Sequence, residues 1–323
     1  MEEDIHQSDP TAEERAESMK RLNRVFLVVQ LLVLFLTTLL LLQSGSYGGT
    51  LFLIIPFSIG VTIGAYSRTQ HTKRGLRQFG LVLLVLASFC ILLVAVGAEG
   101  AICVLMAIGI ICIPALLGTL IGYWMRRAVR GLSVVLIAVL TSSSATLDAY
   151  SDGAVRSVAT RSVIISAPKE RVWAVLTNPV RFLPPRHALL RAGVSYPTTM
   201  AVTRTAGGGA YLDCSYSNGH GRFPIGSLDS LRRLRFTMIE DLTTMSEVSW
   251  LNEVDAPHLK GYFEPFYGEF EIEELGPDRC RLTARTAYAY KIRPAFYWQW
   301  WTDHLTNAMH DNVLRTIREY AER

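Results

Sequence analysis

The sequence lacks the short motifs that mark several large classes of enzyme. It contains no CxxC pair, no HExxH, no GxSxG, no GxxxxGK[ST] loop and no GxGxxG. Zinc proteases, nucleophile-elbow hydrolases, P-loop NTPases and dinucleotide-binding enzymes are therefore not indicated. No two histidines stand four residues apart. The sequence predicts neither a metal site nor a cofactor.

Strong charge of one sign is also missing. The formal net charge is only +4, and the Lys and Arg residues are dispersed or border apolar runs. This pattern lacks the basic patch of a nucleic-acid-binding protein. Of the five cysteines, three lie in apolar runs and act as small hydrophobic residues. Cys214 and Cys280 lie elsewhere, and they could pair only in an oxidising compartment with their Cα atoms close together.

Long stretches of the first half carry no charge at all. After a polar, acidic tail over residues 1–24, apolar runs of bilayer-spanning length follow, and they predict a transmembrane region over residues 25–147. The predicted spans are 25–42, 51–66, 79–96, 101–125 and 131–147. The last is the weakest, because its second half is rich in Ser and Thr.

The loops between these spans set the predicted orientation. Lys and Arg gather before the first span, between the second and third, and between the fourth and fifth, whereas the other two loops carry only Glu99. The positive-inside rule therefore places the N-terminus in the cytoplasm of a multi-pass cell (inner) membrane protein. With five spans the C-terminal domain lies outside the cytoplasm. If the segment 131–147 only lies in the interface, that domain is cytoplasmic.

The first four spans contain no Asp, Glu, Lys, Arg or His. Proton and ion pathways usually need such groups at membrane depth, so the region is predicted to be an anchor or assembly platform. The pairs Gly60/Gly64 and Gly118/Gly122 permit close helix approach. They predict either a homo-oligomer contact or packing within one subunit.

The second half alternates between strand and helix signals. After a linker over 148–159, alternation around Val163 predicts a strand over 162–166, Pro168 opens a helix, and Asn178-Pro179 ends it. Further strands are predicted over 200–205, 210–216 and 234–239, and the segment Ser217-Asn-Gly-His-Gly is interpreted as a turn.

The segments 267–274 and 280–290 form the most sharply specified hairpin. If Glu273 faces Arg281, then Glu271 faces Thr283 and Glu269 faces Arg285, which gives a polar outer ladder. The same register places Phe270 and Ile272 opposite Ala284 and Leu282, all facing inward. A slip by one residue would break both sets.

A long amphipathic helix is predicted over 296–321. Its apolar face is predicted to include Tyr297, Trp298, Trp301, Leu305, Ala308, Met309, Val313 and Tyr320, with Asn312 near the middle. Asp303 and Leu314 are predicted to lie off that face, as are Trp300 and Ile317. These signals predict an α+β helix-grip domain over 160–323, in which a curved antiparallel sheet grips one long C-terminal helix. This domain follows an all-α transmembrane bundle.

At this level the domain resembles a known superfamily. The opening "SVIISAPKERVWAVLTNP" is similar to the start of START-like, SRPBCC domains, often labelled polyketide cyclase/dehydrase or lipid transport. The stretches "PHLKGYFEPFYGEFEIEELGPDRCRL" and "YWQWWTDHLTNAMHDNVLRTI" resemble bacterial membrane proteins that carry such a domain after several spans. The resemblance covers about half the chain and implies a helix-grip fold around a hydrophobic cavity. It does not imply one reaction, because the superfamily includes carriers, sensors and a few enzymes.

Several residues are predicted to line that cavity. They are Tyr288, Tyr290, Trp298, Trp301, Leu305, Met309, Asn312 and His258. Asp213 is a candidate acid or base, but the alternation of its strand favours the solvated outer face. No catalytic residue is assigned. Trp300, pointing away from the core, is predicted to enter the lipid headgroup layer.

Three functions remain open from the sequence. The first is a non-enzymatic, membrane-tethered carrier or sensor that binds a lipid or other hydrophobic small molecule. The second is a cyclase or dehydratase that would need a buried carboxylate or histidine with a shifted pKa in the cavity. The third is an interaction module whose interior is filled by side chains.

Overall fold

The computed structural model describes residues 12–66, 75–125, 132–150, 153–205, 207–238, 245–246, 254, 257 and 261–323. The chain divides into two compact units. The helical unit comprises Met1–Leu41, Thr50–Ile91 and Gly109–Thr146. The sheet unit comprises Leu42–Gly49, Leu92–Ile108 and Leu147–Arg323. The two short segments Leu42–Gly49 and Leu92–Ile108 thus belong with the C-terminal half of the chain.

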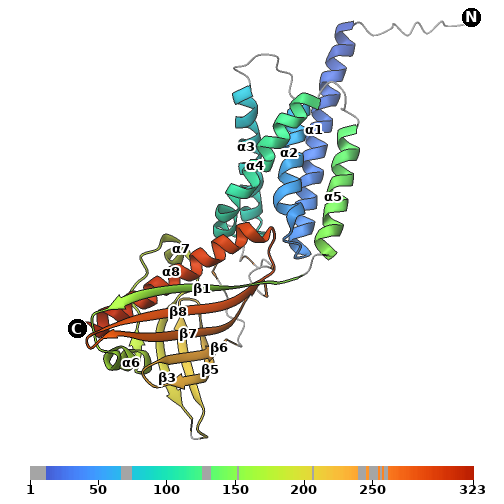
Figure 1. Cartoon of the computed structure of the whole chain (residues 1–323). Helices are drawn as coiled ribbons and strands as arrows, with labels where there is room; N and C mark the ends of the chain where they lie inside the picture. Colours follow the sequence, from blue (N-terminus) through green and yellow to red (C-terminus); the bar gives the residue numbers. More distant parts are fainter. Residues whose placement is uncertain are drawn as a thin grey trace, which may run out of the picture. The chain divides into compact units, whose positions relative to one another are not determined.

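Each predicted span forms a helix. The helices are α1 (Ala12–Gln43), the π-helical turn η1 (Thr50–Ile54) with α2 (Ile55–Tyr66), α3 (Gly75–Ala95), α4 (Ala101–Met125) and α5 (Leu132–Tyr150) (Figure 1). Among the described residues, three helices are long and apolar enough to cross a membrane, namely Glu13–Gln43, Leu76–Ala95 and Ala101–Met125. Thr50–Tyr66 is a shorter apolar helix.

The two glycine pairs of the helical unit face each other across the contact between α2 and α4. A Cβ atom added at Gly60 would overlap the carbonyl oxygen of Ala115, and one added at Gly118 would overlap that of Phe57. Gly64 and Gly122 are as tightly opposed to the backbone of the partner helix. Packing within one chain, one of the two alternatives left open by the sequence, therefore accounts for all of these glycines.

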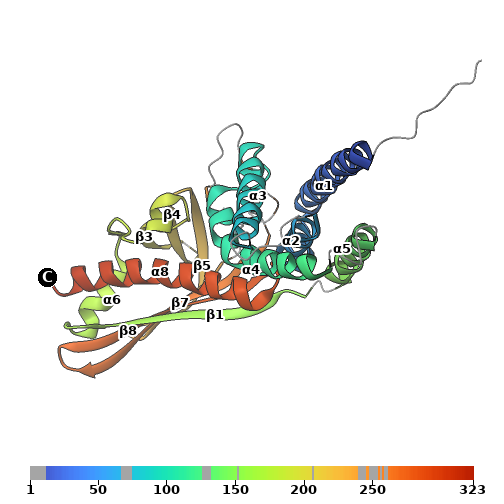
Figure 2. The same ribbon diagram turned by 90° about the horizontal axis from the view of Figure 1, so that it is seen from above.

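The sheet unit contains one antiparallel sheet of eight strands and a long C-terminal helix. The strand order is β1-β8-β7-β6-β5-β4-β3-β2. The strands are β1 (Val155–Ile165), β2 (Val180–Arg181), β3 (Pro197–Arg204), β4 (Ala210–Tyr216), β5 (Gly219–Asp229), β6 (Arg233–Thr237), β7 (Phe263–Gly276) and β8 (Arg279–Tyr290). Helices α6 (Lys169–Thr177) and α7 (Ala188–Ala192) lie between strands in the sequence. Helix α8 (Ala295–Ala321) runs alongside β1 and β8 (Figures 1 and 2). This architecture confirms the predicted α+β helix-grip fold.

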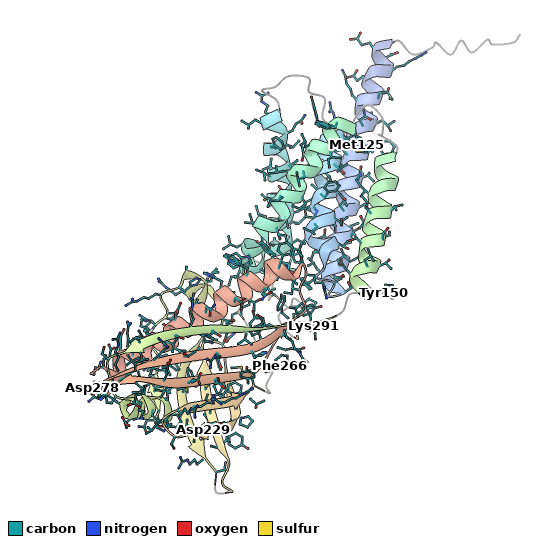
Figure 3. The ribbon with its side chains drawn as sticks, viewed as in Figure 1. Met125, Tyr150, Asp229, Phe266, Asp278 and Lys291 are labelled. Atoms are coloured by element: carbon teal, nitrogen blue, oxygen red, sulfur yellow. The ribbon has the colours of Figure 1, made fainter. Side chains whose placement is uncertain are left out.

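The β7–β8 hairpin has the predicted register. Glu273 pairs with Arg281, Glu271 with Thr283 and Glu269 with Arg285. Phe270 and Ile272 pair with Ala284 and Leu282, and all four are buried. Asp278 and Lys291 mark the two ends of β8 (Figure 3).

Several predicted boundaries differ from the structure. Strand β1 begins at Val155, so it includes residues assigned to the linker 148–159. Pro168 is the N-cap of α6 rather than its first helical residue. The segment interpreted as a turn at 217–221 contains only a short turn, and β5 begins at Gly219. The strand tolerates Gly221 because the ring of Phe223 covers the space of its missing side chain.

The main core fills the space between the sheet and the C-terminal half of α8. Val313, Leu314 and Ile317 of α8 pack there with Val172 and Leu176 of α6. Inward-facing residues of the sheet supply much of the rest of this core, among them Phe223, Leu234, Phe236, Phe270, Ile272, Cys280 and Leu282. Cys214 and Cys280 are buried within it as free thiols.

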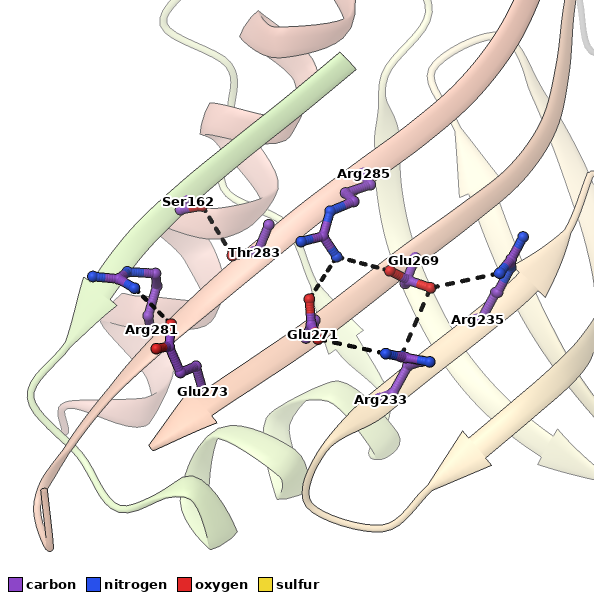
Figure 4. Close-up of polar contacts among 9 residues, drawn as sticks. All are labelled: Ser162, Arg233, Arg235, Glu269, Glu271, Glu273, Arg281, Thr283 and Arg285. Atoms are coloured by element: carbon purple, nitrogen blue, oxygen red, sulfur yellow. Dashed lines mark hydrogen bonds and ion pairs between the residues drawn. The ribbon is translucent and has the colours of Figure 1, made fainter. Parts of the chain in front are cut away.

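The outer face of the same strands carries a network of ion pairs (Figure 4). Arg285 donates to Glu269 at 2.8 Å and to Glu271 at 2.6 Å. Arg233 and Arg235 approach the same carboxylates from β6. The hydrogen bond from Arg285 lowers the pKa of Glu271. The side chain of Glu269 is only 9% exposed, so the ion pairs with these arginines offset the cost of burying a carboxylate.

Replacing Arg285 with Gln is expected to destabilise the sheet unit by about 1–2 kcal/mol, because it leaves a buried carboxylate short of one partner. The matched control is Arg281→Gln, since the Arg281–Glu273 pair is exposed on both sides and should contribute about 0–1 kcal/mol. Chemical denaturation of the two variants in detergent tests this difference. Equal losses would show that the network has no special role.

Candidate functional site

One stripe of α8 changes character half-way along the helix. Residues spaced alternately by four and three positions lie on one face of a helix. The stripe reads Asp303, Asn307, His310, Leu314, Ile317 and Ala321. Its second half is apolar and belongs to the main core. Its first half consists of hydrogen-bonding side chains, and two of them contact the inner face of β8.

Tyr288 makes the first of these contacts. Its side chain is fully buried, and its hydroxyl donates to Oδ1 of Asp303 at 2.6 Å. Burial, together with this hydrogen bond, raises the pKa of Tyr288. The phenol is therefore a neutral donor that holds the Asp303 carboxylate in place.

His310 makes the second contact. Its Nε2 lies 2.8 Å from the hydroxyl of Thr286, two residues before Tyr288 on the same inward face of β8. Burial lowers the pKa of His310 to about 4, with a smaller contribution from the positive charge of Arg161. The imidazole is therefore neutral near pH 7, and it can donate or accept according to its tautomer.

Polar contacts continue towards the first turn of α8. Gln299 donates from Nε2 to the hydroxyl of Ser157 on β1 at 3.1 Å. Tyr290 donates to the carbonyl oxygen of Ala295 at 3.0 Å. Three aromatic rings also pack together here, with Tyr288 lying 5.2 Å from Phe263 and 6.0 Å from Tyr290 between ring centroids. Apolar walls with a few fixed polar groups are typical of small-molecule sites.

The structure brings some of the predicted cavity residues together and separates others. Tyr288 and Tyr290 lie on the inner face of β8, as their parity predicts, and Trp298 is buried in the first turn of α8. Trp301, Leu305 and Met309 are half-buried. Asn312 is buried, and its amide donates to the carbonyl oxygen of Leu183 at 3.0 Å. His258 lies outside the described residues.

The predicted apolar face of the last helix was wrong in its centre. Leu314 and Ile317, predicted to lie off that face, are core residues, and Asp303 bonds to the sheet. The predicted face was centred on a neighbouring side of the helix, because Trp298 and Trp301 are large apolar residues and lie on that side. The missed site residues are Ser157, Thr286, Gln299, Asp303, Asn307 and His310. Thr286 shares the inward parity of Tyr288, and Asp303 and His310 are seven residues apart, so a hydrogen-bonding face was visible in the sequence.

Asp213 lies on the outer face, as its strand pattern favours. It accepts a hydrogen bond from Thr203 at 2.5 Å and pairs with Arg222 at 3.3 Å, whereas its neighbours Leu212 and Cys214 are in the core. Within the described part of the chain, no group of three or more His, Cys, Asp or Glu side chains could hold a metal ion.

Comparisons with known proteins identify no close relative. No family model matches the sequence, and no curated protein matches it. The Zhui aromatase/cyclase from Streptomyces sp. R1128 is 13% identical, with a TM-score of 0.32 over 52% of this chain and 95% of that one. Norcoclaurine synthase from Thalictrum flavum is 15% identical, with a TM-score of 0.31 over 51% and 86%.

A START superfamily protein from Mycobacterium smegmatis is 13% identical, with a TM-score of 0.31 over 53% of this chain and 98% of that one. Likenesses this distant add no functional argument. By its own strand order and its long C-terminal helix, the region from β1 to α8 has the START-like helix-grip fold.

Proposed function

We propose that the chain is a multi-pass membrane protein whose START-like domain binds a lipid or another hydrophobic small molecule between its sheet and α8. The observation that carries this proposal is the polar first half of the α8 stripe, which faces the aromatic inner side of β8. A helix needed only for packing would continue the apolar stripe of its second half, because buried polar groups cost free energy. The domain acts as a carrier or sensor.

The proposed location is the extracytoplasmic side of the membrane. The loops around residues 45–50 and 97–100 carry few charges, which places them outside by the positive-inside rule. Residues 45–49 and 97–100 of these loops belong to the sheet unit. The backbone N–H of Arg293 donates to the carbonyl oxygen of Tyr47 at 2.9 Å. The hydroxyl of Tyr262 donates to the carbonyl oxygen of Gly45. A domain that contacts outside loops lies outside with them, which supports five spans.

Two experiments on the full-length protein test the proposal. Native mass spectrometry of the detergent-purified protein, followed by solvent extraction, should find a co-purifying apolar molecule at near-stoichiometric level. A clean mass that gains nothing from added lipid extract would instead favour the interaction module. Alkaline phosphatase fused after Arg323 should be active, and green fluorescent protein at the same site should be dark. The reverse pattern would place the domain in the cytoplasm.

Two exposed aromatic residues at the start of α8 support contact with lipid. Phe296 is 76% exposed and Trp300 is 58% exposed, and their spacing of four places them on one side of the helix. Trp300 also stacks on the ring of His304 at 5.5 Å between centroids. We propose that these side chains enter the headgroup layer, where aromatic rings are favoured.

Quenching by brominated lipids in nanodiscs tests this contact. Trp300→Phe should remove a strongly quenched component of the tryptophan fluorescence. Trp173→Phe is the matched control, because Trp173 packs against the main core and should be weakly quenched. If both substitutions remove components that are quenched equally, Trp300 does not enter the lipid.

A further inference from the structure

Two polar atoms on the α8 stripe are buried and have no hydrogen-bond partner among the residues that the structure describes. They are Nδ1 of His310 and Oδ1 of Asn307. His310 is only 5% exposed, and its Nε2 is already engaged by Thr286. Buried polar groups are nearly always hydrogen-bonded in folded proteins, so two open ones on the same face require an explanation.

The two atoms form a matched donor and acceptor. Asn307 and His310 are three residues apart on α8, which makes them neighbours on the helix surface. The amide oxygen of Asn307 can only accept. When Thr286 donates to Nε2 of His310, the imidazole proton lies on Nδ1, which then donates. One hydroxyl group can satisfy both atoms, because it donates to the amide oxygen and accepts from the imidazole.

The charges near this pair disfavour an anionic group. Asp303 lies four residues before Asn307 on the same stripe, and its carboxylate is held there by Tyr288. Arg161 on β1, whose positive charge acts on His310, is paired with Asp311 at 3.6 Å. Asn307 also presents an acceptor, which an ionised carboxylate or a phosphodiester cannot bond, because neither carries a hydrogen to donate. A neutral head group is therefore preferred over a charged one.

We propose that Asn307 and His310 bind the hydroxyl group of a neutral, hydrophobic ligand and exclude ligands that end in a carboxylate or phosphate. This inference rests on the proposed function and deepens it, because it names the chemical class of the ligand. Tyr288 and Asp303 act as positioning residues: Tyr288 fixes the carboxylate that repels anions.

The test compares 1-hexadecanol with palmitate, which share their chain length and differ at the head. Each is added to the delipidated full-length protein in detergent, and binding is measured by native mass spectrometry. The parent protein should bind the alcohol at least tenfold more tightly. Asn307→Leu should weaken alcohol binding about tenfold, the usual effect of one lost hydrogen bond, and leave palmitate binding unchanged. Asp303→Asn should strengthen palmitate binding.

His310→Gln and its matched control His304→Gln complete the set. His304 is an exposed histidine on the same helix, so its replacement should leave the preference for the alcohol intact, whereas His310→Gln should reduce it. Equal binding of both ligands, unaffected by Asn307→Leu, would overturn the inference and leave the proposed function standing. A co-purified ligand with an anionic head group would likewise overturn the inference and leave the proposed function standing. A protein that binds neither ligand and carries no apolar molecule would overturn both.

Discussion

Replacing Gly118 with Ala should destabilise the helical unit by about 3 kcal/mol or more, the upper range for overpacking a tight contact. The added Cβ would overlap the carbonyl oxygen of Phe57, which belongs to the backbone of α2. A backbone atom cannot move aside as a flexible side chain does, so α2 and α4 must separate. The opposed Gly60, Gly64 and Gly122 would lose their close contacts at the same time. Thermal unfolding of the detergent-purified protein measures the loss.

Gly80→Ala provides the control for this prediction. Gly80 lies in α3, and a Cβ added there would meet no atom within 4 Å. Ala is the better helix former by about 1 kcal/mol, so Gly80→Ala should be neutral or slightly stabilising. If Gly118→Ala behaves in the same way, the close contact of α2 with α4 does not exist in solution. If only the oligomeric state changes, Gly118 serves a contact between chains.

The register of the β7–β8 hairpin could be predicted because two independent patterns agree. Glutamates alternate with apolar residues on β7, and arginines and a threonine do so on β8. A one-residue slip would bury the charges and expose the core. Strand β5 had no such support. Its first residues, Gly219, His220 and Gly221, have the composition of a turn. The ring of Phe223, two residues further along the same strand, covers Gly221 and makes the segment suitable for a strand.

The candidate site could be predicted only in part, for a physical reason. Parity along β8 places Tyr288 and Tyr290 inside without any knowledge of the partner helix. The buried face of a helix, by contrast, is predicted from the hydrophobicity of each residue taken alone. Asp303, Asn307 and His310 are polar, so this procedure assigns them to the exposed side. Tyr288 compensates the polarity of Asp303, and Thr286 engages one nitrogen of His310. Pairs of this kind are invisible until the two elements are brought together. A functional interior is therefore where a hydrophobic pattern is expected to fail.

The buried His310 should make the stability of the sheet unit depend on pH between about 6.5 and 4. Burial lowers the pKa of His310 from 6.5 to about 4, so the unfolded chain binds the proton that the folded protein excludes. Folding is then most stable above pH 6.5, and it loses stability as the pH falls towards 4. The loss is about 3 kcal/mol, since each unit of pKa difference corresponds to about 1.4 kcal/mol. Below pH 4 this contribution no longer changes.

Unfolding followed by tryptophan fluorescence from pH 7.5 to 4 tests this expectation. His310→Gln should flatten the dependence in this window, because a neutral amide replaces the titrating ring. Glu271→Gln should act in a different window: the pKa of Glu271 is lowered from 4.5, so its stabilisation is lost only as the pH falls below that value. His304→Gln measures the remaining histidine of α8, whose pKa burial also lowers. A parent protein that loses no stability before pH 4.5 would mean that His310 is accessible to water in the folded state, and the neutral hydrogen-bonding site would then lose its physical basis.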